Sequence, residues 1–384
     1  MSRKRHKRGS GNSFTRTRLL TALEANLLVL GVLAYAVYLE SSSADAYYRS
    51  VQEDEWVEWA SFWAFALAGA LFVAMALRRW RATGKLPWFA AGVALFCWFV
   101  ALEEISWGQR LLGYRPPTYF LVENFQQELN VHNVVDTKYR KLALKGVILG
   151  YGVVLPVLAL LPGLRGILRR LGIEAPPLAL APAFVAAYIL YVKYPWTHTG
   201  EWVELMLGLG FLFAALLGLR RYPREPATRF ARTHPALIIA AGWLLVLGLG
   251  LANAAASRRL VSRHPEAIAA ARGEAAALKQ DFLTRQLPTK CGLHKRIYTY
   301  KEKFHQDYLL EGAFSRLTTQ GLPEARAEYF LDPWNSPYWV RAQCSDDRSR
   351  VSVYIYSFGP NRRRDSDRWQ IVDDDVGAYV IQTP

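Results

Sequence analysis

Residues 203–219 read VELMLGLGFLFAALLGL, an apolar run that a single glutamate interrupts. A run of this length is close to the ~20 residues that a helix needs to cross the hydrocarbon core of a bilayer. Six more such runs cover 20–38, 58–77, 87–102, 144–161, 178–192 and 236–256. A soluble protein of this length has no core large enough to bury seven such runs. The runs are also too long to be strands of a membrane barrel. The sequence predicts a polytopic α-helical membrane protein with about seven spans in the lipid bilayer.

Lysine and arginine concentrate in the N-terminal tail and in the linkers that follow the second, fourth and sixth runs, at 78–85, 165–170 and 220–232. The positive-inside rule therefore places the N-terminus in the cytoplasm and the segment after the seventh run outside. We expect a bacterial inner-membrane protein whose C-terminal domain is periplasmic. Because topology explains much of the net charge of +15, no nucleic-acid partner is expected.

Three regions follow: a basic cytoplasmic tail at 1–18, a seven-span membrane domain at 19–256 and a periplasmic α+β domain at 257–384. An alanine-rich stretch from 254 to about 287 predicts one helix that continues out of the seventh span. Cys291 and Cys344 are the two cysteines of the predicted periplasmic domain. A disulfide between them fits an oxidising compartment, and two unpaired thiols are the alternative.

Polar residues concentrate at the end of the third run, where 103–110 read EEISWGQR, and in the following loop, where 124–133 read NFQQELNVHN. Ionisable groups at a membrane boundary pair with one another or face a polar cavity. The candidate catalytic residues of such a pocket are Glu103, Glu104, Ser106, Arg110 and His132. The alternative is a structural network in which Glu104 pairs with Arg110 and the amides hold the loop. This motif pair resembles uncharacterised multi-pass bacterial membrane proteins, which implies one shared site and no activity.

A second cluster begins the sixth span, where His198, Glu201 and Glu204 are spaced by three and share a helix face. Imidazole and carboxylate groups bind Zn²⁺ or another divalent metal, although this spacing is not an established metal motif. The number of spans and the residue types also resemble the membrane hydrolase superfamily that includes the alkaline ceramidases, but its His-x-x-x-His element is absent. A metal-dependent hydrolase or transferase acting on a lipid at the outer face is therefore an alternative function.

The C-terminal domain carries DPWNSPY at 332–338, YIYSFGPN at 354–361 and DDD at 373–375. This combination, over about 322–377, resembles the major pseudopilin of type II secretion systems. The resemblance implies a pilin-like α+β fold, an interaction with periplasmic or pilin-like subunits, and calcium bound by the aspartate-rich loop. Two features depart from that family: six spans precede the helix, and the chain start lacks the peptidase signal.

The candidate calcium ligands are hard carboxylate oxygens, which Ca²⁺ prefers: Asp365, Asp367, Asp373, Asp374 and Asp375. Neighbouring arginines at 362–364 and 368 offer the alternative of Arg–Asp pairs without an ion. The primary expectation is an envelope protein that presents a pseudopilin-like, calcium-binding domain for protein interaction or secretion-type assembly. A transporter ranks below both functions because the spans show no inverted repeat.

Overall fold

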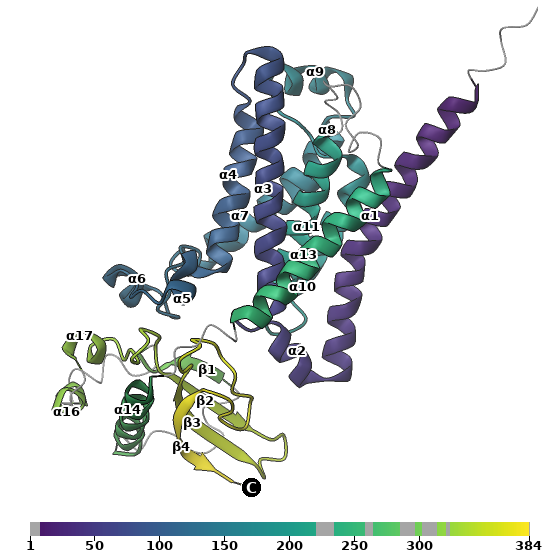
Figure 1. Cartoon of the computed structure of the whole chain (residues 1–384). Coiled ribbons are helices and arrows are strands. Elements are labelled where there is room, and N and C mark those ends of the chain that lie inside the picture. Colours follow the sequence, from purple (N-terminus) through teal and green to yellow (C-terminus); the bar gives the residue numbers. More distant parts are fainter. Residues whose placement is uncertain are drawn as a thin grey trace, which may run out of the picture. The chain divides into compact units, whose positions relative to one another are not determined.

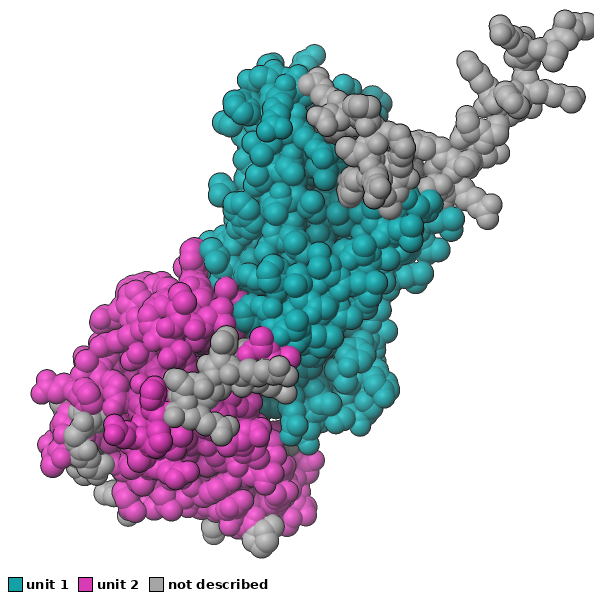
Figure 2. Space-filling view, in the orientation of Figure 1, with its two compact units in different colours: residues 1–51, 55–104, 137–254 teal, residues 52–54, 105–136, 255–384 magenta. Residues whose placement is uncertain are grey.

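The computed structural model describes residues 8–219, 234–257, 264–284, 296–301, 313–319 and 323–383. The chain divides into two compact units, coloured in Figure 2. The helical unit comprises residues 1–51, 55–104 and 137–254, and the sheet unit comprises 52–54, 105–136 and 255–384. The prediction placed a single boundary at 257, whereas the chain passes between the units several times.

The helical unit is built around α11 (Thr199–Leu219), which is buried over most of its length and packs against α3 (Trp56–Thr83), α10 (Ala181–Lys193) and α1 (Arg8–Ser42). Helix α4 (Trp88–Glu104) lies beside α3 (Figure 1). Small residues allow close approach: a Cβ added to Gly208 on α11 would lie 2.8 Å from the Cβ of Ala64 on α3. The other helices of this unit are α2 (Ala44–Ser50), α7 (Thr137–Leu149), η2 (Gly150–Val154), α8 (Leu155–Leu158), α9 (Pro162–Leu171), η3 (Leu178–Leu180) and α13 (Pro235–Ser257).

Among the described residues, five helical segments are long and apolar enough to cross a membrane: Leu20–Ser42, Trp56–Thr83, Thr137–Leu158, Thr199–Leu219 and Pro235–Ala256. A sixth is the pair Trp88–Glu104 and Ser106–Leu112, which is bent by 66°. The remaining predicted span forms the shorter apolar helix Leu178–Lys193. The fold is therefore mostly helical, with five or six candidate spans, and the seventh span remains a prediction.

The sheet unit contains an antiparallel sheet in the order β1 (Arg296–Thr299), β2 (Trp339–Cys344), β3 (Val351–Ser357) and β4 (Val376–Gln382). Helix α14 (Pro265–Thr284) packs against β3 and β4 (Figure 1), and its Leu278 and Phe282 join the apolar core of the sheet. Short helices complete the unit: η1 (Ser106–Gly108), α5 (Gln109–Leu112), α6 (Thr118–Glu123), α16 (Ala313–Thr319) and α17 (Glu324–Ala327). This arrangement agrees with the predicted α+β class.

The predicted continuous helix from the seventh span into the alanine-rich stretch is wrong. Helix α13 ends at Ser257, His264 is not helical, and α14 begins at Pro265. Proline has no N–H group to donate inside a helix and clashes with the carbonyl four residues earlier, but it fits the first helical position. Pro265 therefore begins a new helix and cannot lie in the middle of a stalk.

The loop after α4 folds as part of the sheet unit. The ammonium group of Lys301 donates to the carbonyl oxygens of Leu121 and Val122, at 2.7 Å for Val122, and so satisfies the C-terminal end of α6. The side chain of Gln127 donates to the carbonyl of Tyr329 at 2.8 Å. These bonds join positions about 200 residues apart in the sequence. The C-terminal sheet is therefore not a self-contained 257–384 domain.

The two cysteines of the predicted disulfide have different outcomes. Cys344 is buried at the end of β2 and belongs to the core of the sheet unit. Cys291 lies outside the described residues, so its pairing with Cys344 stays a prediction. Cys97 is a free, buried thiol in α4, as expected for a cysteine inside a span.

Candidate functional site

Arg110 is the centre of a buried ion network in the sheet unit. Its Nε atom lies 2.9 Å from Asp54 and a terminal nitrogen lies 2.9 Å from Glu128. Ser106 donates to the same Glu128 carboxylate at 2.7 Å. Burial raises the pKa of Glu128, and the neighbouring guanidinium of Arg110 partly opposes that rise. Two of the candidate catalytic residues, Ser106 and Arg110, thus meet at Glu128.

The amides of the 124–133 motif hold the loop itself. Asn124 donates to the carbonyl of Glu128 at 2.6 Å and to the side chain of Asn130 at 2.9 Å. Gln109 accepts from the backbone N–H of Leu129 at 2.7 Å. These contacts favour the structural alternative for this part of the polar segment. His132, the third candidate in the sheet unit, is half-buried in the same loop.

Local backbone geometry explains why the loop can turn so sharply after α4. Ser106, Trp107 and Gly108 all have positive φ, at 45°, 55° and 79°. Two non-glycine residues in the left-handed region cost free energy, of order 1–3 kcal/mol each. The buried bonds of Ser106 to Glu128 help to retain this conformation.

The Asp332-Pro-Trp-Asn-Ser-Pro-Tyr338 motif forms a buried turn on the sheet. One carboxylate oxygen of Asp332 accepts from the backbone N–H groups of Trp334 and Ser336, and the other accepts from the hydroxyl of Ser357 at 2.5 Å. Complete burial raises the pKa of Asp332 to about 7 despite these bonds. At the end of the turn, the hydroxyl of Tyr338 donates to Glu274 on α14 at 2.6 Å. The motif therefore joins β3 to α14.

Three of the five candidate calcium ligands lie in a shared environment in the loop between β3 and β4. The Asn361 amide nitrogen lies 2.5 Å from both Asp365 and Asp374. Burial and the adjacent Asp374 raise the pKa of Asp365 to about 6. Asp375 accepts from the backbone N–H of Ser366 at 2.8 Å, while its other oxygen is buried with no hydrogen-bond partner in the described part of the chain.

The other two aspartates lie apart from this group. Asp367 accepts from the backbone N–H groups of Trp369 and Gln370, a local turn, and Asp373 is exposed. Burial raises the pKa of Asp375 well above its ordinary value, and the charges of Asp365 and Asp374 raise it further. The loop therefore holds two carboxylates, Asp365 and Asp375, in an environment that disfavours their charged forms.

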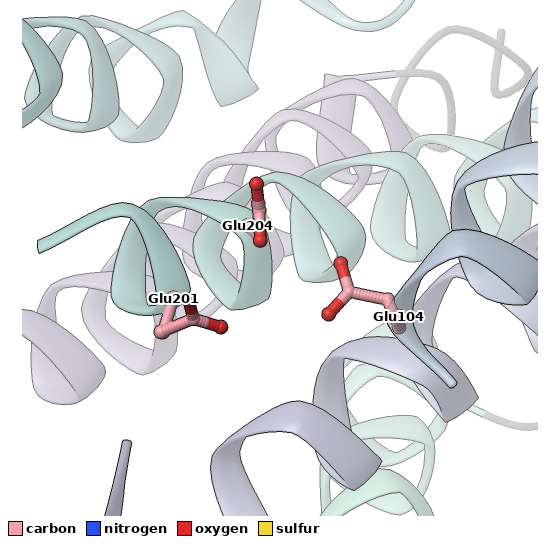
Figure 3. A group of neighbouring side chains, drawn as sticks. All are labelled: Glu104, Glu201 and Glu204. Atoms are coloured by element: carbon pink, nitrogen blue, oxygen red, sulfur yellow. The ribbon is translucent and has the colours of Figure 1, made fainter. Parts of the chain in front are cut away.

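In the helical unit, α4 and α11 bring Glu104, Glu201 and Glu204 together (Figure 3). Each offers a carboxylate oxygen, and these oxygens lie within 4.8 Å of one another. Within the described ranges, this is the one group of three or more acidic, histidine or cysteine side chains that is so close. Glu103 is buried beside Glu104 on α4.

His198, which the sequence analysis grouped with Glu201 and Glu204, does not belong to this group. It has a φ of 59° immediately before α11, and its ring lies 6.3 Å from the ring of Tyr48. Sequence reasoning also missed Glu58 and Ser61 of α3, which act on Glu104. Their spacing of three at the start of a span was the available signal.

Comparison of the chain with protein-family models, curated proteins and solved structures finds no match.

Proposed function

We propose that the chain is an inner-membrane protein of the bacterial envelope that presents a calcium-binding, pseudopilin-like α+β unit to periplasmic proteins. The observation that carries this proposal is the grouping of Asp365, Asp374 and Asp375 between β3 and β4, with one Asp375 oxygen unsatisfied. A helix packed on an antiparallel sheet with an aspartate-rich loop before the last strand supports the same assignment. The five or six apolar helices would anchor this unit.

Calcium suits this loop because Ca²⁺ takes six to eight oxygen ligands and tolerates irregular geometry. Asp365, Asp374 and Asp375 would hold it, and backbone carbonyls of the loop would supply further oxygens. Bound calcium would favour the charged forms that burial disfavours.

Two arginines of the loop make contacts with groups other than its aspartates. Arg362 donates to the carbonyl of Trp334 at 3.1 Å, and Arg364 lies 4.7 Å from the ring centroid of Trp339. Arg363 approaches Asp365 only at 4.0 Å. The approach of Arg363 to Asp365 is the contact that supports the alternative of a loop cross-linked by Arg–Asp pairs.

The test is a thermal-unfolding measurement on the full-length protein in detergent, with calcium or with a chelator. At a calcium concentration 100 times the dissociation constant, binding stabilises the folded state by about 2.7 kcal/mol. Asp374→Asn and Asp375→Asn should each reduce that gain. Asp346→Asn, an exposed aspartate in the β2–β3 turn, is the matched control and should retain it. Equal melting temperatures in calcium and chelator would remove calcium from the proposal.

Orientation needs a separate test. Protease added to spheroplasts should cleave an epitope placed after residue 384 and leave an N-terminal epitope intact. The reverse pattern would contradict the periplasmic assignment and its periplasmic partners.

A further inference from the structure

Three glutamates of the helical unit place their carboxylates close together. Glu104 is the last residue of α4 and only 8% exposed. Its carboxylate points from α4 toward Glu201 and Glu204, which lie on successive turns of α11 (Figure 3). Like charges at this separation disfavour simultaneous ionisation.

Helix dipoles stabilise this cluster unevenly. Glu201 lies in the first turn of α11, where the positive end of the helix dipole favours a carboxylate. Glu104 lies at the C-terminal end of α4, where the dipole disfavours a carboxylate. In addition, the charged groups that act most strongly on Glu104 are Glu204, Glu201 and Glu58, all of them acidic. Glu104 is therefore the carboxylate that most needs a positive charge.

A second feature points to a bound ligand at the same place. Ser61 of α3 is 1% exposed, and its hydroxyl has no hydrogen-bond partner among the described residues. The hydroxyl approaches the Glu104 carboxylate without meeting hydrogen-bond geometry. A buried hydroxyl without a hydrogen-bond partner destabilises the folded state. A hydrated cation held by Glu104 would bring a metal-bound water to which the Ser61 hydroxyl could hydrogen-bond.

We propose that Glu104, Glu201 and Glu204 bind a hard divalent cation of the Mg²⁺ or Mn²⁺ class. Ser61 would bond to a water molecule that the cation holds. The three oxygens lie within 4.8 Å of one another, close to the ~4.2 Å that separates two oxygens on opposite sides of one ion at the ~2.1 Å typical of Mg²⁺–oxygen bonds. The donor set is all oxygen, which favours Mg²⁺ and Mn²⁺ over the softer ions that thiolate and imidazole select. This site belongs to the helical unit and goes beyond the proposed calcium loop.

Mg²⁺ sites commonly use one or two carboxylates, several waters and the phosphate oxygens of a substrate. A cation held here would therefore keep coordination positions for water and for an anionic ligand. The cation bound by the cluster would act as a Lewis acid toward such an anionic ligand.

The test is a Mn²⁺ titration of the full-length protein in lipid nanodiscs, followed by electron paramagnetic resonance. Wild-type protein should bind Mn²⁺, and Glu104→Gln and Glu204→Gln should each weaken binding by at least about tenfold, since second-layer changes alone cost 10–100-fold. Glu40→Gln, on the exposed end of α1, should bind as wild type. Asp375→Asn should also retain this Mn²⁺, which separates this site from the calcium loop.

Two outcomes overturn the proposal. One is the absence of Mn²⁺ binding that depends on Glu104 and Glu204. The other combines two results: Glu104→Gln melts at the same temperature as wild type or higher, and metal does not stabilise wild type. Protons shared among the carboxylates, and not a cation, would then neutralise the cluster. Ser61→Ala keeps the proposal testable if the glutamate variants fail to fold: it should weaken Mn²⁺ binding while leaving the three carboxylates in place.

Discussion

Arg110 offers the sharpest test of how the sheet unit is held together. Its guanidinium neutralises the carboxylates of Asp54 and Glu128, and the three side chains are each only 5–6% exposed. Arg110→Met would leave two buried carboxylates without this cation. Removing one partner of a buried pair typically costs about 3–5 kcal/mol, because the remaining charge is uncompensated. For a domain of this size, that cost corresponds to a decrease of roughly 6–20 °C in melting temperature.

The assay is hydrogen exchange with mass spectrometry on full-length protein in nanodiscs, read on β3, whose residues are all buried. Its amides report the opening free energy of the sheet unit. Arg272→Ala, an exposed arginine on α14, is the matched control and should change it by less than about 0.5 kcal/mol. The triple variant Arg110→Met, Asp54→Asn, Glu128→Gln should recover most of the lost stability. Replacing a whole buried ion network by uncharged residues often changes the free energy of unfolding little.

The pH dependence checks the same reasoning independently. Burial raises the folded-state pKa of Glu128, so the stability that its protonation contributes is present at low pH and is lost as pH rises. Without Arg110 this dependence should become steeper, and the deficit of Arg110→Met should shrink between pH 8 and pH 5. A loss below about 1 kcal/mol, or a deficit that does not change with pH, would refute the account of Arg110 as the neutralising group.

Two further predictions concern the same unit. Lys301→Met removes the donor to the carbonyls of Leu121 and Val122 and should destabilise α6 by about 1–3 kcal/mol, seen as faster amide exchange at 118–123 but unchanged exchange in α11. Asp332, whose pKa rises from 3.8 to about 7, contributes stability below pH 3.8 that is lost as pH rises through about 7. Asp332→Asn should therefore flatten the stability profile between pH 4 and 7 in chemical denaturation, whereas a profile parallel to wild type would contradict the assignment.

The helical unit was largely readable from the sequence because its signal is local. A long apolar run predicts a helix by itself, and each of the seven predicted runs is mostly helical in the structure. The break before α14 had a local signal as well, namely Pro265, which the alanine-rich composition obscured. The spacing of Glu201 and Glu204 also predicted their shared face, while their proximity to Glu104 depends on how α4 packs in the unit.

No local signal in the sequence showed which segments of the chain would form the sheet unit. Gln127 bonds to Tyr329 and Lys301 to Leu121, and pairs so distant in sequence leave no periodicity to detect. The segment 103–110 predicts either a catalytic pocket or a structural network, because buried polar residues mark both. Only the partners distinguish these cases: Arg110 meets Glu128, whereas Glu104 meets other carboxylates.

This division of the polar motif changes what the C-terminal sheet can do. Since 52–54 and 105–136 fold together with 255–384, the sheet unit is completed by loops that emerge from the helical unit at several points. After a single cut between α13 and α14, Lys301 and Gln127 would still bond the 105–136 loop to the C-terminal part of the chain. One cut between α13 and α14 would therefore not release the sheet unit from the rest of the chain.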